Sequence, residues 1–167
     1  MIPTSGGRAL WRGMSFSAFV IVLASASFAL GQQGRPAPPA RRIVQPANYK
    51  PSPAPLVPAI LVGDTLYLSG STGGDPATGQ LVAGGLDAEM KQIMANVGTV
   101  LRAADMSMSD VVAVTAYLAD MNDYARFNDL YRTYFPSGAF PTRSTVAVKE
   151  LARGARLELT MTAVRSK

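Results

Sequence analysis

The sequence of 167 residues contains no cysteine and no histidine. Disulfides, thiol nucleophiles, histidine-based triads, imidazole bases and the common zinc ligand sets are therefore excluded. Acidic residues are also missing before Asp64, whereas six basic residues precede it. Any catalysis must use carboxylates, hydroxyls, arginine, lysine, backbone groups or bound water, and we predict neither a metal site nor a cofactor.

The formal charge of +5 comes from the N-terminal part of the chain. Its six basic residues leave ten Lys and Arg against eleven Asp and Glu, so the rest of the chain carries about −1. A nucleic-acid-binding domain would place its basic residues on the folded body. We therefore expect no nucleic acid partner, and membrane contact only through the basic N-terminal part.

Residues 1–31 have the pattern of a secretion signal. Two arginines precede an apolar run from Met14 to Leu30, and small residues gather towards the end of this run. Such an order is typical of a cleavable signal peptide. The sequence predicts export to the periplasm or the cell exterior, with cleavage between about Ala26 and Gly31; an uncleaved membrane anchor is the alternative.

Residues 32–54 are dense in proline, alanine and arginine. Proline-rich segments adopt extended, semi-rigid conformations, so this part is predicted to be a tether. Residues 55–167 have enough apolar residues for one core and show no internal repeat. These residues are therefore predicted to form a single domain.

Apolar residues in residues 55–167 follow strand and helix periods in turn. Strands are predicted over 56–62, 65–69, 111–118, 142–148 and 156–164, and helices over 86–101 and 122–135. Pro58 indicates that the first strand is an edge strand, and we expect the last two strands to pair with each other. Asp87 and Glu89 lie in the first turn of the first helix, where the helix dipole favours acids.

The element order ββαβαββ predicts an α+β fold, in which two helices cover one face of a mixed sheet. The strands carry few charges on either face. We therefore expect the second face to be buried against sister subunits.

The strongest functional signal lies between Phe140 and Val148. Pro141 restricts the backbone before a β-branched run, which places Arg143 at the beginning of a strand. A guanidinium presents a planar fork of donors, so the predicted ligand is a small carboxylate. An ordinary surface arginine is the alternative.

Several motifs resemble those of the RidA family, also called YjgF/YER057c/UK114. They are Pro141–Ser144, Leu66–Gly70, Asp120–Tyr124 with the following Asn128, and Ala163–Val164. The resemblance implies a chorismate-mutase-like subunit in a homotrimer, with ligand sites between subunits. It also implies hydrolysis of reactive 2-imino and enamine acids to 2-keto acids and ammonia.

The resemblance assigns binding of the substrate carboxylate to Arg143. Ser69, Gly70, Asn128 and Thr145 are implied as further contacts, with Ser69 at the junction that helps to position the attacking water. These residues form the predicted substrate site.

Two family positions depart from the pattern. In the family, a glutamate on the last strand positions the water or relays its proton, and a tyrosine on the first strand contributes. Aligned on Ala163 and on Ser69, this chain has Thr160 in place of the glutamate and Leu56 in place of the tyrosine. Thr160 thereby takes the catalytic position beside Arg143 and Ser69, but a threonine is no base near neutral pH.

Three functions stay open at this point. The first is a RidA-like hydrolase of 2-imino acids, and the second is a non-catalytic trimer that binds small carboxylates through Arg143. The third is RNA cleavage or protein interaction, as described for some relatives, and the nearly neutral body disfavours nucleic acid. Export away from the enzymes that produce such imines counts against the first.

Overall fold

The computed structural model of the chain describes residues 38–47, 49–51, 53–136 and 138–166. The predicted signal segment 1–31 lies outside the described residues. The strands are β1 (Arg41–Val44), β2 (Ala59–Val62), β3 (Thr65–Leu68), β4 (Ser71–Thr72), β5 (Val111–Leu118), β6 (Thr142–Ala147) and β7 (Leu157–Val164), and the helices are α2 (Gly85–Ala103) and α3 (Tyr124–Arg132). None of the described helices is long and apolar enough to cross a membrane.

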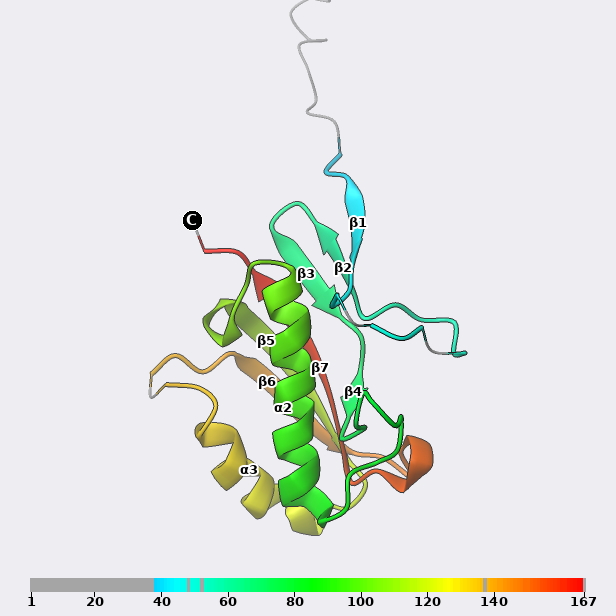
Figure 1. Cartoon of the computed structure of the whole chain (residues 1–167). Coiled ribbons are helices and arrows are strands. Elements are labelled where there is room, and N and C mark those ends of the chain that lie inside the picture. Colours follow the sequence, from blue (N-terminus) through cyan, green and yellow to red (C-terminus); the bar gives the residue numbers. More distant parts are fainter. Residues whose placement is uncertain (1–37, 48, 52, 137, 167) are drawn as a thin grey trace, which may run out of the picture. The chain divides into compact units, whose positions relative to one another are not determined.

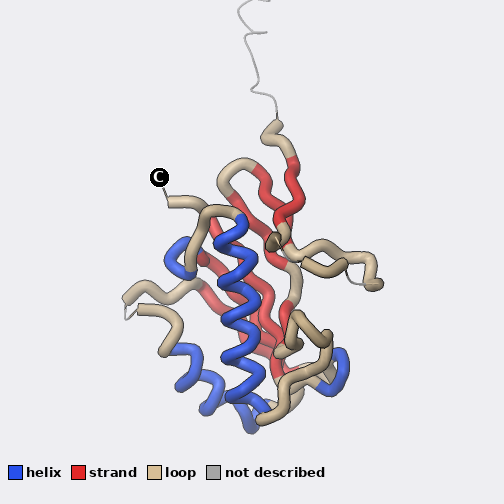
Figure 2. Tube along the Cα trace, in the orientation of Figure 1, coloured by secondary structure: helices blue, strands red, loops and turns tan. Residues whose placement is uncertain are grey.

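The seven strands form one mixed sheet. Six of them follow the order β1-β2-β3-β7-β5-β6, and β4 pairs with β7 beyond the end of β3. The β5–β6 pair is parallel, and the other pairs are antiparallel. Both helices lie on the same face of the sheet (Figures 1 and 2). This arrangement confirms the predicted α+β fold.

The core lies between α2 and the sheet. The apolar stripe of α2 is buried, as its helical spacing predicted: Leu86, Met90, Ile93, Val97 and Leu101. The sheet contributes every second residue of β7, each 3% exposed or less: Leu157, Leu159, Met161 and Ala163. Because side chains alternate along a strand, this burial sends the residues between them to the opposite face.

The predicted pairing of the last two strands is wrong. β7 lies between β3 and β5, whereas β6 pairs with the far side of β5. α3 connects β5 to β6, and parallel strands need such a crossover because the chain must return to the same end of the sheet. β6 is therefore an edge strand, and no other strand of the described part pairs with it.

Part of the predicted tether over residues 32–54 is a strand in the structure. Arg41–Val44 form β1, which pairs along the whole of β2, and Val44 is only 2% exposed. β2 is consequently flanked on both sides and is not the edge strand that Pro58 suggested. Pro58 precedes the first paired residue of β2, so its missing N–H costs the ladder nothing.

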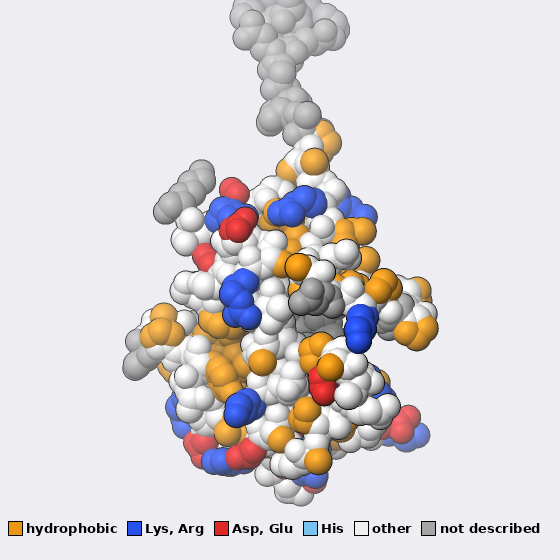
Figure 3. Space-filling view, viewed as in Figure 1, with side chains coloured by type: hydrophobic (Ala, Val, Ile, Leu, Met, Phe, Trp, Pro, Cys, Tyr) orange, Lys and Arg blue, Asp and Glu red, His pale blue; other side chains and the backbone are white. Residues whose placement is uncertain are grey.

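The face of the sheet opposite the helices mixes threonines with exposed apolar side chains and carries few charges. Thr160 and Thr162 of β7 lie there, paired with Thr115 and Tyr67 respectively, and Tyr67 is 52% exposed. Lysine, arginine and acidic side chains are instead spread over the helix side (Figure 3). We refer to the surface around Tyr67, Thr115, Thr160 and Thr162 as the open face.

Candidate active site

Arg143 points to the helix face of the sheet, because it pairs in register with the core residue Val114. Its Nη2 donates a hydrogen bond to Asn128 Oδ1 at 2.6 Å. Its Cζ lies 4.9 Å from the ring centre of Phe127 and 4.5 Å from that of Tyr131. α3 thus supplies one amide and two ring faces, which hold the guanidinium in a fixed orientation.

Two buried hydroxyls near Arg143 have no hydrogen-bond partner among the described residues, namely Thr145 Oγ1 and Tyr131 OH. Thr145 shares the face of Arg143, since it lies two residues further along β6. Burial raises the pKa of Tyr131 to about 12, although the Arg143 charge opposes this shift. Buried hydroxyls are normally paired, so unpaired ones beside a guanidinium suit a ligand with oxygen acceptors.

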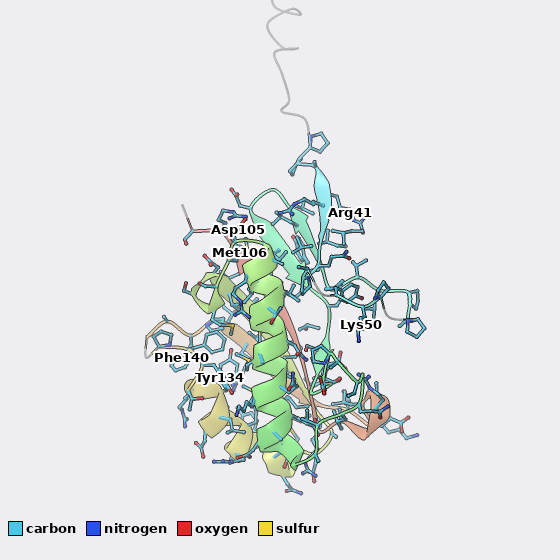
Figure 4. All side chains as sticks on the ribbon, viewed as in Figure 1. Arg41, Lys50, Asp105, Met106, Tyr134 and Phe140 are labelled. Atoms are coloured by element: carbon cyan, nitrogen blue, oxygen red, sulfur yellow. The ribbon has the colours of Figure 1, made fainter. Side chains whose placement is uncertain are left out.

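Aromatic residues border this region. Phe140 precedes β6 and is 48% exposed, and it lies on the same flank of the molecule as Tyr134 (Figure 4). Phe127, Tyr131 and Phe135 form a chain of tilted rings, with centres 5.5 and 4.8 Å apart. The aromatic stripe of α3 is therefore both core and support for the arginine.

The Ser69–Gly70 junction lies at the end of β3. Ser69 Oγ donates to the carbonyl of Val57 at 2.6 Å, and Ser69 N donates to that of Pro58 at 2.9 Å. The serine hydroxyl therefore shapes the junction and is not paired with a base that would activate it. Leu56, next to Val57, is 52% exposed and adds an apolar side chain close to this junction.

Glu158 lies directly against Gly70. A Cβ added to Gly70 would come within 2.0 Å of Glu158 Oε1, so only glycine permits this approach. The contact continues in β4, where Thr72 pairs with Glu158. A carboxylate thus lies beside the Ser69–Gly70 backbone.

The structure places Glu158, and not Thr160, at the Ser69–Gly70 junction. Thr160 lies opposite Thr115 on the open face, in a hollow that Tyr67 also lines. The carboxylate at the junction thus belongs to the residue two positions before Thr160 on the same strand. Residues two apart on a strand share a face, so the alternating pattern cannot distinguish the two positions.

The structure does not bring all predicted site residues together within one chain. Arg143, Asn128 and Thr145 gather under α3, on the helix face at the β6 edge. Ser69 and Gly70 connect β3 to β4, and Glu158 lies on β7. Two strands separate β3 from β6 in the sheet. Glu158 pairs with Tyr117 and so points to the face opposite the core. We call these groups the arginine half-site and the glutamate half-site.

The described part of the chain holds no group of three or more Asp and Glu residues that could bind a metal ion. The chemistry that the described geometry offers is carboxylate recognition in one half-site and proton transfer by a carboxylate in the other.

Residues 47–165 match the family described as Endoribonuclease L-PSP. Proteins similar to the chain include those named 2-iminobutanoate/2-iminopropanoate deaminase. The goat protein of this name is 44% identical over 124 residues, which cover 74% of this chain and 90% of the relative. The human one is 40% identical over the same shares. The chain belongs to the RidA family.

Solved structures of RidA relatives have the same fold. The yeast YEO7 protein superposes with a TM-score of 0.71 at 31% identity, covering 76% of this chain and all of that chain. E. coli TdcF, solved with bound serine, gives a TM-score of 0.69 at 29% identity and covers 75% of this chain and 99% of its own.

Proposed function

We propose that this RidA member hydrolyses 2-imino acids to 2-oxo acids and ammonia, the chemistry for which its goat and human relatives are named. The observation that carries the proposal is the contact of the Glu158 carboxylate with the Ser69–Gly70 backbone. Without this carboxylate the chain would offer only a binding site. With it, the chain has both a binding site for the substrate carboxylate and a base.

The arginine half-site binds the carboxylate of the substrate. Arg143 is held by Asn128 and by two rings, so its fork loses little freedom when a ligand binds. The hydroxyl of Thr145 can donate to the same carboxylate. This arrangement selects small acids with an oxygen-bearing head group.

The glutamate half-site supplies the base. Water adds to C2 of the protonated imine, the C=N electron pair moves to nitrogen, and Glu158 takes a proton from the water, which gives a carbinolamine with an NH2 group. The glutamic acid then protonates this amino group. The C2–N bond breaks and ammonia leaves as C=O forms, and the Glu158 carboxylate takes the proton of the hydroxyl group and releases it to solvent. Positioned acid–base catalysis of this kind contributes about 10²–10⁴-fold to the rate.

A neighbouring subunit completes the site in this proposal. The two half-sites of one chain lie on opposite faces of the sheet and on strands that are not neighbours. A homotrimer that buries the open face would also cover Tyr67, which one chain leaves 52% exposed. In such a trimer, Arg143 of one subunit faces Glu158 of the next.

Export is a further part of the proposal. The basic residues and apolar run of residues 1–31 support a secretion signal, and the absence of cysteine is compatible with an oxidising compartment. N-terminal sequencing of the protein recovered from the periplasm or medium tests this. An N-terminus near Gln32 is expected, whereas an intact Met1 on membranes would support the anchor.

The activity test uses 2-iminopropanoate and 2-iminobutanoate generated in the assay. The wild-type protein should accelerate their hydrolysis, Glu158→Gln should lower the rate about 10²-fold or more, and Thr160→Val should not. Arg143→Ala should raise the Kd for 2-oxobutanoate and lower kcat/KM. A Thr160→Val variant as impaired as Glu158→Gln would refute the assignment of Glu158.

A non-catalytic carboxylate binder is the second candidate, and one observation favours it. Leu56 stands where the family has a tyrosine, so one polar group near the junction is missing. In that case the wild-type protein binds 2-oxobutanoate through Arg143 but leaves imine decay at the buffer rate. The same set of variants therefore separates the two functions.

A further inference from the structure

Glu89 of α2 is the only buried charged residue in the described part of the chain, with 2% exposure. Its Oε2 accepts hydrogen bonds from the backbone N–H groups of Arg156 at 2.8 Å and Leu157 at 3.2 Å. These two residues directly precede Glu158 at the beginning of β7. The carboxylate of Glu89 thus ties the first residues of this strand to the helix.

Placing a carboxylate at this buried position has a high cost in desolvation free energy. Removing its charge from water costs several kcal/mol unless hydrogen bonds replace the lost hydration. Hydrogen bonds to a charged acceptor are shorter and about twice as strong as those to a neutral one. The charged carboxylate of Glu89 therefore holds the backbone N–H groups of Arg156 and Leu157 more tightly than a neutral carbonyl oxygen would.

Glu89 also contacts a second chain segment that borders Glu158. A Cβ added to Gly73 would lie 2.7 Å from Glu89 Cα and 2.8 Å from its Cβ and Cγ. Gly73 follows β4 directly, and β4 lies beside α2 (Figure 1). Thr72, the residue before Gly73, pairs with Glu158. Two segments next to Glu158, the beginning of β7 and the end of β4, are therefore held against Glu89.

We propose that Glu89 is a positioning residue, which acts through the backbone of β7 and β4 to hold the Glu158 carboxylate at Gly70. Glu89 touches no substrate in this arrangement. The inference rests on the proposed function, because it matters for turnover only where Glu158 is the base. It goes beyond the sequence interpretation of Glu89 as an acid in the first turn of a helix, where the helix dipole favours it.

The test compares Glu89→Leu, which removes the acceptor, with Glu89→Gln, which keeps one oxygen acceptor without the charge. Glu150→Leu is the matched control, since Glu150 is an exposed glutamate in the loop before β7. Each protein is analysed as a folded oligomer for its kcat, its KM and its Kd for 2-oxobutanoate. Thermal unfolding measures the purely structural effect.

Glu89→Leu should lower kcat at least about 10-fold and leave the Kd for 2-oxobutanoate within about twofold, because the arginine half-site is untouched. Glu89→Gln should restore most of kcat, and Glu150→Leu should match the wild type. A Glu89→Leu protein that is less stable but has wild-type kcat would overturn the inference, because Glu89 would then be only a structural clamp.

Crystal structures of the wild type and of Glu89→Leu give a readout that does not depend on activity. We expect the Glu158 carboxylate to leave Gly70 in the variant, and an unchanged Glu158 would overturn the inference. If the wild type hydrolyses no imine, the proposed function fails, and this structural comparison still decides whether Glu89 positions Glu158. If the wild type is active and Glu89→Leu equals it, only the inference about Glu89 fails.

Discussion

Alanine in place of Gly70 should lower the catalytic rate with little effect on stability, whereas alanine in place of Gly73 should lower the stability. In Gly70→Ala the new Cβ would meet Glu158 Oε1 at 2.0 Å and Cδ at 3.0 Å, which is the mobile end of a side chain. Normal contacts between heavy atoms require roughly 3.5 Å, so the carboxylate must move by about 1.5 Å. Gly70 is not among the residues with positive φ, so alanine adds no backbone strain there.

A displacement of about 1 Å in a catalytic group costs about 10²-fold in rate. Gly70→Ala should therefore lower kcat about 10²-fold, while its stability changes by about 1 kcal/mol or less, the cost of an altered rotamer. The Kd for 2-oxobutanoate should stay near the wild-type value, because Arg143 is unaffected. The assay is imine hydrolysis together with ligand binding and thermal unfolding.

Gly73→Ala is the matched comparison. Its Cβ would lie 2.7 Å from Glu89 Cα, which is backbone and cannot rotate away. Overpacking of this kind costs about 1–3 kcal/mol, so Tm should fall clearly. A Gly70→Ala protein with the wild-type rate, or a Gly73→Ala protein with the wild-type Tm, would refute the packing argument around Glu158 and Glu89.

Two further predictions concern stability. Between pH 10.0 and about 12 the unfolded chain loses the Tyr131 proton while the folded chain keeps it, so stability should decrease as pH rises through this range. Tyr131→Phe should weaken this decrease in urea unfolding at successive pH values; an unchanged pH dependence contradicts it. Arg153 has a left-handed φ of 60° and donates to Gly79 O and Thr72 Oγ1. Arg153→Ala should be less stable than Arg153→Gly by about 1 kcal/mol, because glycine relieves the strain; equal urea midpoints would contradict this.

The helices and strands could be predicted from the sequence because their apolar periods are long and regular. The stripe from Leu86 to Leu101 fixes both the helical type of α2 and its buried face. The alternation along β7 likewise fixes which of its residues enter the core. Both signals are local, and burial against one layer is sufficient to produce them.

Strand order depends on contacts between residues far apart in the sequence, and the predicted strand pairing was wrong. The loop between β6 and β7 suggested a pair, but β7 lies between β3 and β5. β1 was not predicted, because Arg41 and Arg42 are polar and exposed and the surrounding prolines are typical of a tether. Its Val44 is the sole fully buried residue in this strand, and one apolar residue gives no period.

The candidate site shows the same limit at the level of single residues. The position of Arg143 at the end of a strand could be predicted because the features that determine it, Pro141 and the β-branched run, are its neighbours in the sequence. The register of β4 against β7 decides between Glu158 and Thr160, and β4 has only two residues, Ser71 and Thr72. A pattern of period two is identical for both alternatives.

The role of Glu89 depends on three segments that meet only in the fold. In the sequence it is an acid near the beginning of a helix, where the dipole explains it without any further partner. Its burial follows from Gly73, whose missing side chain lets β4 approach α2, and from the beginning of β7, whose N–H groups need an acceptor. These contacts join residues that are far apart in the sequence, so the role proposed for Glu89 can be inferred from the structure but not from the sequence.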